Sequence, residues 1–202
     1  MAVSKFRPPR RGGRPSIVEA ATYSAVETLR DGRRVEIRAL RQDDRAELLA
    51  AVGRTSRESL YRRFFSVKRG FTEKETAYFL NIDFVDHVAL VALVEEAGRP
   101  VIVGGARYIV LRPGKAEIAF AVIDPYQGQG IGAALMRHLA GIARGAGLRE
   151  LIADVLPEND AMLKVFAKSG FPLRTKREAD VVHVSLRLDA TRHHPPSPPL
   201  GS

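Results

Sequence analysis

Apolar and polar residues alternate along several short stretches of the chain, which is the pattern of strands that bury one face. In residues 117–123, the side chains of Ile118, Phe120 and Val122 would point to one face and those between them to the other. Apolar stretches bounded by turn residues predict further strands at 35–40, 87–94, 101–110, 151–156 and 181–188. The pattern therefore predicts a sheet built mostly in the middle of the chain.

Helices are predicted where apolar residues recur at intervals of three and four. Three short ones should follow the first strand, after residues 42–44 and at 57–65 and 73–80, and two more should span 131–146 and 159–168. Thr55 and Thr72 are each followed three residues later by glutamate, which is the spacing of a capping box. Residues 17–34 give no firm prediction, and residues near 172–180 are expected to form loops.

The predicted order is one strand, three helices, a three-stranded meander, and then helix, strand, helix and strand. This order predicts an α+β fold with a mixed central sheet flanked by helices, antiparallel at first and with one parallel crossover through the helix at 131–146. A dinucleotide-binding fold is excluded because its glycine turn would follow the first strand of a repeating series. A P-loop is excluded because no Gly-Lys-Ser/Thr follows the glycines.

The composition suits one globular domain with tails, since 45% of the 202 residues are hydrophobic. We expect tails at 1–24 and 190–202, the second rich in proline, around a single domain at 25–189. The chain has no cysteine, which excludes disulfides and thiolate zinc sites. No apolar run approaches the roughly 18 residues that span a bilayer, and no secretory signal is recognisable, so a cytoplasmic protein without membrane contact is expected.

The net charge of +9 is concentrated at the N-terminus, where residues 1–16 hold five basic residues and no acidic one. With three prolines and two glycines this tail should be disordered. It would serve as a solubilising extension or, alternatively, as an arm that binds nucleic acid or an acidic partner. Phe6 is its one aromatic residue, which disfavours base stacking and makes a nucleic-acid partner the weaker interpretation.

Three glycines stand between the strand at 117–123 and the helix that follows it. Asp124 and Pro125 would end the strand, because proline has no amide hydrogen for a ladder. Gly128, Gly130 and Gly132 then lead directly into the apolar helical pattern. Glycines permit close backbone approach, and the free amides and dipole of a helix N-terminus attract anions. This turn is therefore predicted to bind phosphate.

The same turn, Gln127-Gly128-Gln129-Gly130-Ile131-Gly132, resembles the Q/R-x-x-G-x-G/A motif of the GNAT acyltransferases. The run Glu158-Asn159-Asp160-Ala161, with Gly170-Phe171 after it, is similar to a later helix of that family. The resemblance covers roughly residues 33–188. Within the family, the runs at 57–65 and 29–38 resemble bacterial protein lysine acetyltransferases of the Pat type.

The resemblance implies the GNAT fold and acetyl-CoA-dependent N-acetylation of an amine. The cofactor acetyl-CoA would be a co-substrate. A protein lysine is preferred as acceptor over a small amine. The residues implied to bind the cofactor are Val122, Ile123, Gln127, Gly128, Gln129, Gly130, Ile131, Gly132, Ala133, Asn159 and Phe166.

Glu117 is predicted to be the general base that deprotonates the acceptor amine, directly or through a water. It lies six residues before Ile123, about 20 Å along an extended strand, which is comparable to an extended pantetheine arm. No metal site is predicted, because the adjacent His193 and His194 of the tail lack carboxylate partners.

One position departs from the family pattern. Many GNAT enzymes carry a tyrosine seven residues after the position of Asn159, where it protonates the departing thiolate, and here this residue is Phe166. The thiolate would leave unassisted or use another donor. Two alternatives stay open: an acetyltransferase acting on small amines or amino acids, and a non-catalytic acyl-CoA sensor.

Overall fold

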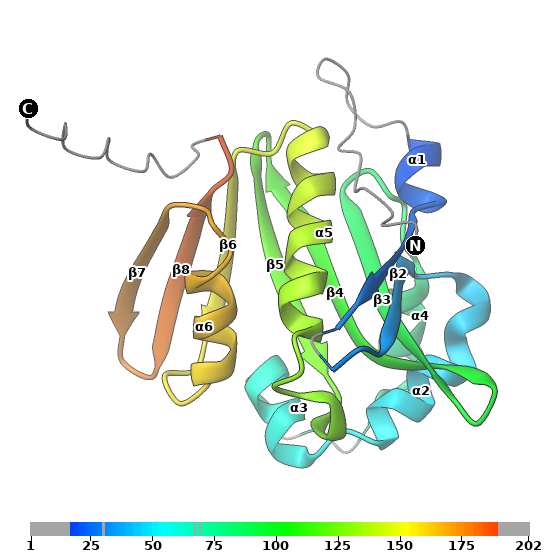
Figure 1. Ribbon diagram of the computed structural model, residues 1–202. Coiled ribbons are helices and arrows are strands. Elements are labelled where there is room, and N and C mark those ends of the chain that lie inside the picture. The colour runs from blue at the N-terminus through cyan, green and yellow to red at the C-terminus, as the bar shows by residue number, and fades with distance from the viewer. Residues whose placement is uncertain (1–16, 30, 67, 69, 190–202) are drawn as a thin grey trace, which may run out of the picture.

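One mixed sheet of eight strands, in the order β1-β2-β3-β4-β5-β6-β8-β7, forms the centre of the molecule (Figure 1). Its neighbouring strands are antiparallel except for β5 and β6, which are parallel. This computed structural model describes residues 17–29, 31–66, 68 and 70–189. The elements are α1 (Ile17–Ala21), β1 (Ser24–Thr28), β2 (Arg34–Ala39), the 3₁₀ turn η1 (Gln42–Asp44), α2 (Arg45–Gly53), α3 (Arg57–Phe64), α4 (Glu73–Leu80), β3 (His87–Glu96), β4 (Arg99–Arg112), β5 (Lys115–Val122), the 3₁₀ turn η2 (Asp124–Tyr126), α5 (Ile131–Gly145), β6 (Glu150–Val155), α6 (Asp160–Ala167), β7 (Leu173–Glu178) and β8 (Val181–Arg187).

Helices cover both faces of the sheet. Figure 1 shows α5 and α6 in front of the strands and α4 behind them. The approach of α5 to β4 depends on Gly104, because a Cβ there would lie 3.3 Å from Ile131 and 3.1 Å from the Ala121 carbonyl. Arg107, three residues on in β4, points to the opposite face, where it meets the ring of Phe79 from α4. The two faces of β4 therefore serve different layers.

Strand β3 lies in the middle of the core. Its residues from His87 to Val94 are all buried, since helices lie over both faces of this part of the sheet. The apolar side of α5, including Leu135 and Leu139, packs on the sheet with both residues fully buried. This layer supports the turn that precedes α5.

A buried ion pair fixes the segment that leads from β2 to α2. Asp44 receives two hydrogen bonds of 2.7 Å from the guanidinium of Arg38, and a third, also 2.7 Å, from the Arg41 amide. Burial alone would raise the pKa of Asp44, but these hydrogen bonds outweigh it and hold the pKa below its usual value. Residues 42–44 were predicted to cap a helix, and Asp44 is indeed the N-cap residue of α2. Residues 42–44 also form η1, and the Asp44 side chain turns back to Arg38 and Arg41 and makes no cap hydrogen bond to α2.

The α+β prediction is confirmed, as are the antiparallel meander β3-β4-β5 and the parallel crossover through α5. Three predictions were wrong. Thr55 was predicted to begin a capping box, but the N-cap of α3 is Ser56, whose hydroxyl accepts from the Ser59 amide at 3.2 Å. Residues 173–178, expected to be a loop, form β7, which pairs with β8 and lies at the edge of the sheet. Residues 17–24, placed in the N-terminal tail, include α1 and the start of β1. The rest of that tail and residues 190–202 lie outside the described residues.

Candidate active site

Strands β5 and β6 separate soon after they pair. Their parallel ladder holds three residue pairs and ends where Glu117 meets Ile152. Beyond that point β5 keeps its ladder with β4, up to Val122 opposite Gly104, but none with β6. A cavity of about 1170 Å³ opens here. An extended ligand can therefore lie along β5 in the place of a neighbouring strand.

All of the residues predicted to act on the substrates line this one cavity. Glu117 lies where the strands part, and Gln127 to Ala133 lie past the other end of β5. Glu117 is solvent-exposed and makes no hydrogen bond or ion pair within the described part of the chain. Its carboxylate is therefore open to a ligand in the cavity.

The glycine turn has the geometry of an anion site. Gly128 and Gly130 adopt φ values of +74° and +95°, a left-handed conformation that favours glycine. Gly130 is the N-cap of α5, and its carbonyl accepts the first helical hydrogen bond from the Ala134 amide at 2.9 Å. The amides of the first helical residues before Ala134 consequently have no intrahelical partner. They offer donors at the positive end of a 15-residue helix.

The side chain of Gln127 is held within the turn rather than directed outward. Its amide nitrogen donates to Ser59 Oγ and to the Val122 carbonyl, each at 3.0 Å. The Ile123 amide donates a hydrogen bond to the Val103 carbonyl, and the Ile123 carbonyl accepts one from the Tyr126 amide. In this arrangement Gln127 fixes the shape of the turn, and the Val122 carbonyl keeps one lone pair for a further donor.

Helix α3 is tied to the same turn through Asp124. This carboxylate accepts hydrogen bonds from the Ser56 amide, the Ser56 hydroxyl and the Ser59 hydroxyl, all at 2.8 Å. Burial would raise the pKa of Asp124, but these three donors outweigh it and lower the pKa. These hydrogen bonds therefore tie the start of α3 to the segment that leads into the glycine turn.

Arg33 adds a cation at the turn that sequence reasoning did not identify. Its guanidinium donates to the Gln129 side chain, lies 5.5 Å from the ring centre of Tyr126 and pairs with Asp31. Gln129 also donates to the Pro125 carbonyl at 2.7 Å, so both ends of its amide are held. Arg33 is 96 positions from Gln129 in the chain, and no local pattern signals that contact.

Asn159 and Phe166 lie on the α6 side of the cavity. Asn159 is the N-cap of α6, and its side-chain oxygen accepts a hydrogen bond from the Met162 amide at 3.2 Å. Phe166 is buried, and its ring meets that of Phe120 edge-on at 5.8 Å. The position that carries tyrosine in many GNAT enzymes thus forms part of the packing between α6 and β5.

Two more arginines stand on the Glu117 side of the cavity, among aromatic rings from α3 and α4. Arg63 lies 4.7 Å from the ring centre of Phe64, and Arg107 lies 4.4 Å from that of Phe79. Neither arginine was assigned a role from the sequence. The register of β4 and β5 places Arg107 opposite Ala119, one step along the same face from Glu117.

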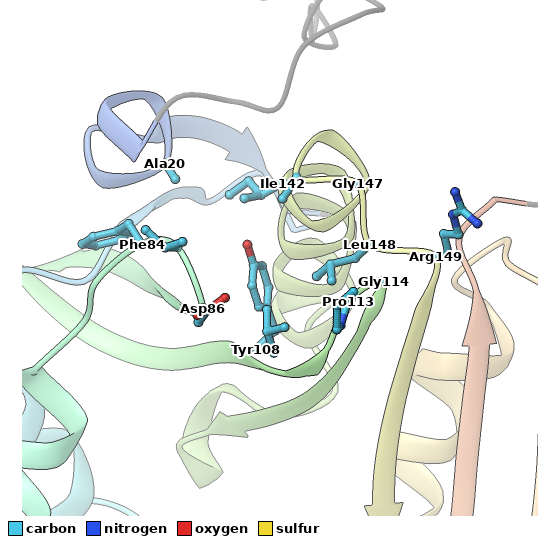
Figure 2. Close-up of a pocket in the computed structure, with 13 residues that line it drawn as sticks. Ala20, Phe84, Asp86, Tyr108, Pro113, Gly114, Ile142, Gly147, Leu148 and Arg149 are labelled. Carbon is cyan, nitrogen blue, oxygen red and sulfur yellow. The ribbon is translucent and has the colours of Figure 1, made fainter.

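A second cavity of about 790 Å³ lies at the other end of α5, between that helix, α1 and the loop before β3 (Figure 2). The Tyr108 hydroxyl points into it, and burial, with the nearby Asp83 and Asp86, raises the pKa of Tyr108 to about 12. None of the predicted site residues lines this cavity. It is therefore separate from the candidate active site.

Two further observations concern the described residues only. They contain no cluster of three or more His, Cys, Asp or Glu side chains arranged to hold a metal ion. None of their helices is both long and apolar enough to cross a membrane.

Comparison with known proteins gives a consistent result. The sequence model of the acetyltransferase (GNAT) family matches residues 56–171. A curated acetyltransferase of Pseudomonas aeruginosa is 36% identical over 147 residues, which cover 72% of this chain and 79% of the relative. The acetyltransferase Pat of Mycolicibacterium smegmatis is 41% identical over 119 residues, 57% of this chain and 34% of Pat, so the match spans about a third of that relative. The crystal structure of the GNAT domain of S. lividans PAT has a TM-score of 0.74 at 34% identity, covering 81% of this chain and 96% of that domain.

Proposed function

This chain belongs to the acetyltransferase (GNAT) family, and we propose that it transfers the acetyl group of acetyl-CoA to side-chain amines of protein lysines. The family assignment and the class of enzyme confirm the predicted resemblance to the GNAT acyltransferases, and the family uses acetyl-CoA. The preference for a protein acceptor is supported by the similarity to Pat acetyltransferases from two organisms.

The residues present suit coenzyme A. Its pyrophosphate needs donors and positive charge, and the free amides that precede Ala134 and the guanidinium of Arg33 supply both. Its pantetheine arm carries amides that need hydrogen-bond partners. Beyond Glu117, the edge of β5 that faces β6 has no strand paired to it, so its backbone groups can serve as those partners. We propose that Gln127 and Asp124 act by fixing the turn, and that Gly128, Gln129, Gly130, Ile131, Gly132 and Ala133 contact the phosphates. Val122, Ile123, Asn159 and Phe166 would line the arm.

Glu117 is proposed as the general base. A lysine ammonium must lose a proton before its nitrogen can attack a thioester, and a carboxylate beside it can take that proton directly or through a water. Glu117 makes no hydrogen bond or close ion pair among the described residues, and it stands where the strands part. With Phe166 in the packing of α6, we propose that the thiolate leaves without a protein acid at this position, since a thiol pKa of about 8.5 makes it a tolerable leaving group.

The single observation that carries the proposal is the parting of β5 and β6, with the glycine turn at one end and Glu117 at the other. The test is release of free coenzyme A from acetyl-CoA in the presence of a lysine-containing protein, with mass spectrometry to locate the acetylated lysines. Release that occurs only with small amines would favour the small-molecule alternative. Cofactor binding by calorimetry without release for any acceptor would favour the sensor.

A further inference from the structure

The cavity wall beside Glu117 carries an excess of positive charge. Arg63 comes from α3 and Arg107 from β4, and both side chains are partly buried. Neither lies within ion-pair distance of a carboxylate in the described part of the chain, although Glu117 attracts Arg63 from farther away. The charge of each guanidinium is therefore without a directly bound counter-ion there.

The contacts that the two arginines make do not neutralise them. Arg107 donates to His87 Nε2 at 3.1 Å, which requires that nitrogen to carry a lone pair. Burial, followed by the charge of Arg107, lowers the pKa of His87, so the ring is neutral at pH 7. The remaining contacts are aromatic faces: Phe79 for Arg107 and Phe64 for Arg63. These contacts orient the guanidinium groups and leave their charges in place.

Both groups are nevertheless cations under ordinary conditions. Burial lowers the pKa of Arg63 to about 10, and burial together with repulsion from Arg63 lowers that of Arg107 to about 9. Two cations that repel one another in a desolvated wall are stabilised by an anion between or beside them. The rings of Phe64, Phe71 and Phe79, whose centres are 4.6–5.9 Å apart, pack against one another in this wall.

We propose that Arg63 and Arg107 bind a carboxylate that the acceptor carries next to its reacting amine. This inference rests on the proposed acetyl transfer and names the class of acceptor. An acceptor with an ammonium group alone meets two cations and one carboxylate, whereas a neighbouring acid group on the acceptor supplies the second carboxylate and cancels the excess positive charge. Planar guanidinium groups bind carboxylates through paired hydrogen bonds, and their charge also favours the neutral form of the amine that must attack.

The carboxylate has two possible sources, an aspartate or glutamate beside a target lysine and the α-carboxylate of a free amino acid. The experiment compares kcat/KM for capped peptides with one lysine flanked by glutamate or by glutamine, and for leucine against leucinamide. The peptide arm tests a protein acceptor and the leucine arm a free amino acid. If the acceptor is a protein, we expect kcat/KM to be about 10- to 100-fold higher for the glutamate peptide than for the glutamine peptide. If it is a free amino acid, the same ratio is expected for leucine over leucinamide. Hydrogen bonds between charged groups have a strength of this order.

The preference should depend on the two arginines. In Arg63→Gln and Arg107→Gln the preference should fall to near unity, while Arg107→Lys, which keeps the charge, should retain part of it. Arg57→Gln is the matched control, since Arg57 is exposed at the start of α3 and does not line the cavity. Calorimetric binding of coenzyme A reports whether each variant is folded, and the wild-type comparison stands even if a variant is not.

The outcomes separate this inference from the proposed function. Equal rates for acidic and neutral acceptors would overturn the carboxylate site and leave acetyl transfer intact. A preference that persists in both glutamine variants would also overturn it. No turnover with any peptide or amine would instead contradict the proposed function. Turnover confined to leucine would support the carboxylate site and move the acceptor from protein lysines to free amino acids.

Discussion

The replacement Glu117→Gln tests the proposed base with little disturbance of the protein. Glutamine has the same size and shape, and Glu117 is exposed and makes no hydrogen bond or ion pair in the described chain. The expected change in the free energy of unfolding is therefore within about 0.5 kcal/mol. Coenzyme A affinity should also be unchanged, because the glycine turn begins beyond the far end of β5, about 20 Å away.

The rate, in contrast, should fall strongly at neutral pH. A lysine amine with a pKa of about 10.4 is neutral in roughly one molecule in 2,500 at pH 7, which corresponds to about 4.6 kcal/mol. A positioned general base typically contributes about 10²- to 10⁴-fold. We expect Glu117→Gln to lower kcat/KM by about 10²- to 10³-fold at pH 7. The difference in rate should shrink as the pH rises. Below the pKa of the amine, each increase of one pH unit makes its neutral form about tenfold more abundant, so the base is needed less.

The assay follows free thiol release from acetyl-CoA with a lysine peptide between pH 6.5 and 9.5. Glu95→Gln is the control, since Glu95 is an exposed glutamate on β3 that does not line the cavity. Equal turnover of the variant and the wild type at pH 7 would remove Glu117 as the base. A deficit of the same size at every pH would mean that Glu117 acts in some way other than proton removal.

Three other replacements have expected outcomes. Asp44→Asn should lower the free energy of unfolding by about 3–5 kcal/mol in chemical denaturation, because it leaves Arg38 buried without its partner. The pKa of Asp44 is lower in the folded than in the unfolded protein, where it is near 3.8. Its contribution to the free energy of unfolding is therefore fully present above pH 3.8 and is lost as the pH falls through the folded-state pKa. Acid titration of the stability of the wild type and of Asp44→Asn measures this loss. Gly130→Ala should cost about 1–2 kcal/mol in thermal unfolding through its left-handed φ of +95°, even though the space around a Cβ is open. Arg33→Gln should weaken coenzyme A binding about tenfold in calorimetry and less at high salt, and an unchanged dissociation constant would exclude Arg33 from the phosphate site.

The parts of the fold that the sequence predicted are those with strong local signals. The strand β5, the glycine turn and α5 combine alternation, φ values that favour glycine and a wide apolar stripe, and each was predicted close to its observed position. Strand β7 was missed because nearly every residue from Leu173 to Glu178 is polar and exposed. Such an edge strand is held by its ladder with β8 rather than by burial, so its pattern resembles that of a loop.

In the candidate site, too, the residues with local sequence signals were predicted and those brought in by long-range contacts were not. The glycine turn and Asn159 follow from local sequence, since capping and anion binding depend on neighbouring residues. Arg33 reaches Gln129 from the turn before β2, and Arg107 reaches Phe79 from β4, so both contacts join segments that are remote in the chain and exist only after the sheet has formed. Nothing in the spacing of basic residues distinguishes them from the other arginines of this basic chain.

The short ladder between β5 and β6 divides the sheet mechanically. Five strands stand on one side of it and three on the other, and three residue pairs plus the packing of α5 and α6 connect them. A thioester carrier lying along β5 would act as a temporary ninth strand that closes this seam. The sheet would then be most rigid with the cofactor bound, and β5 and β6 would be able to move apart once coenzyme A is released. The rigidity of the sheet would therefore change once in each catalytic cycle.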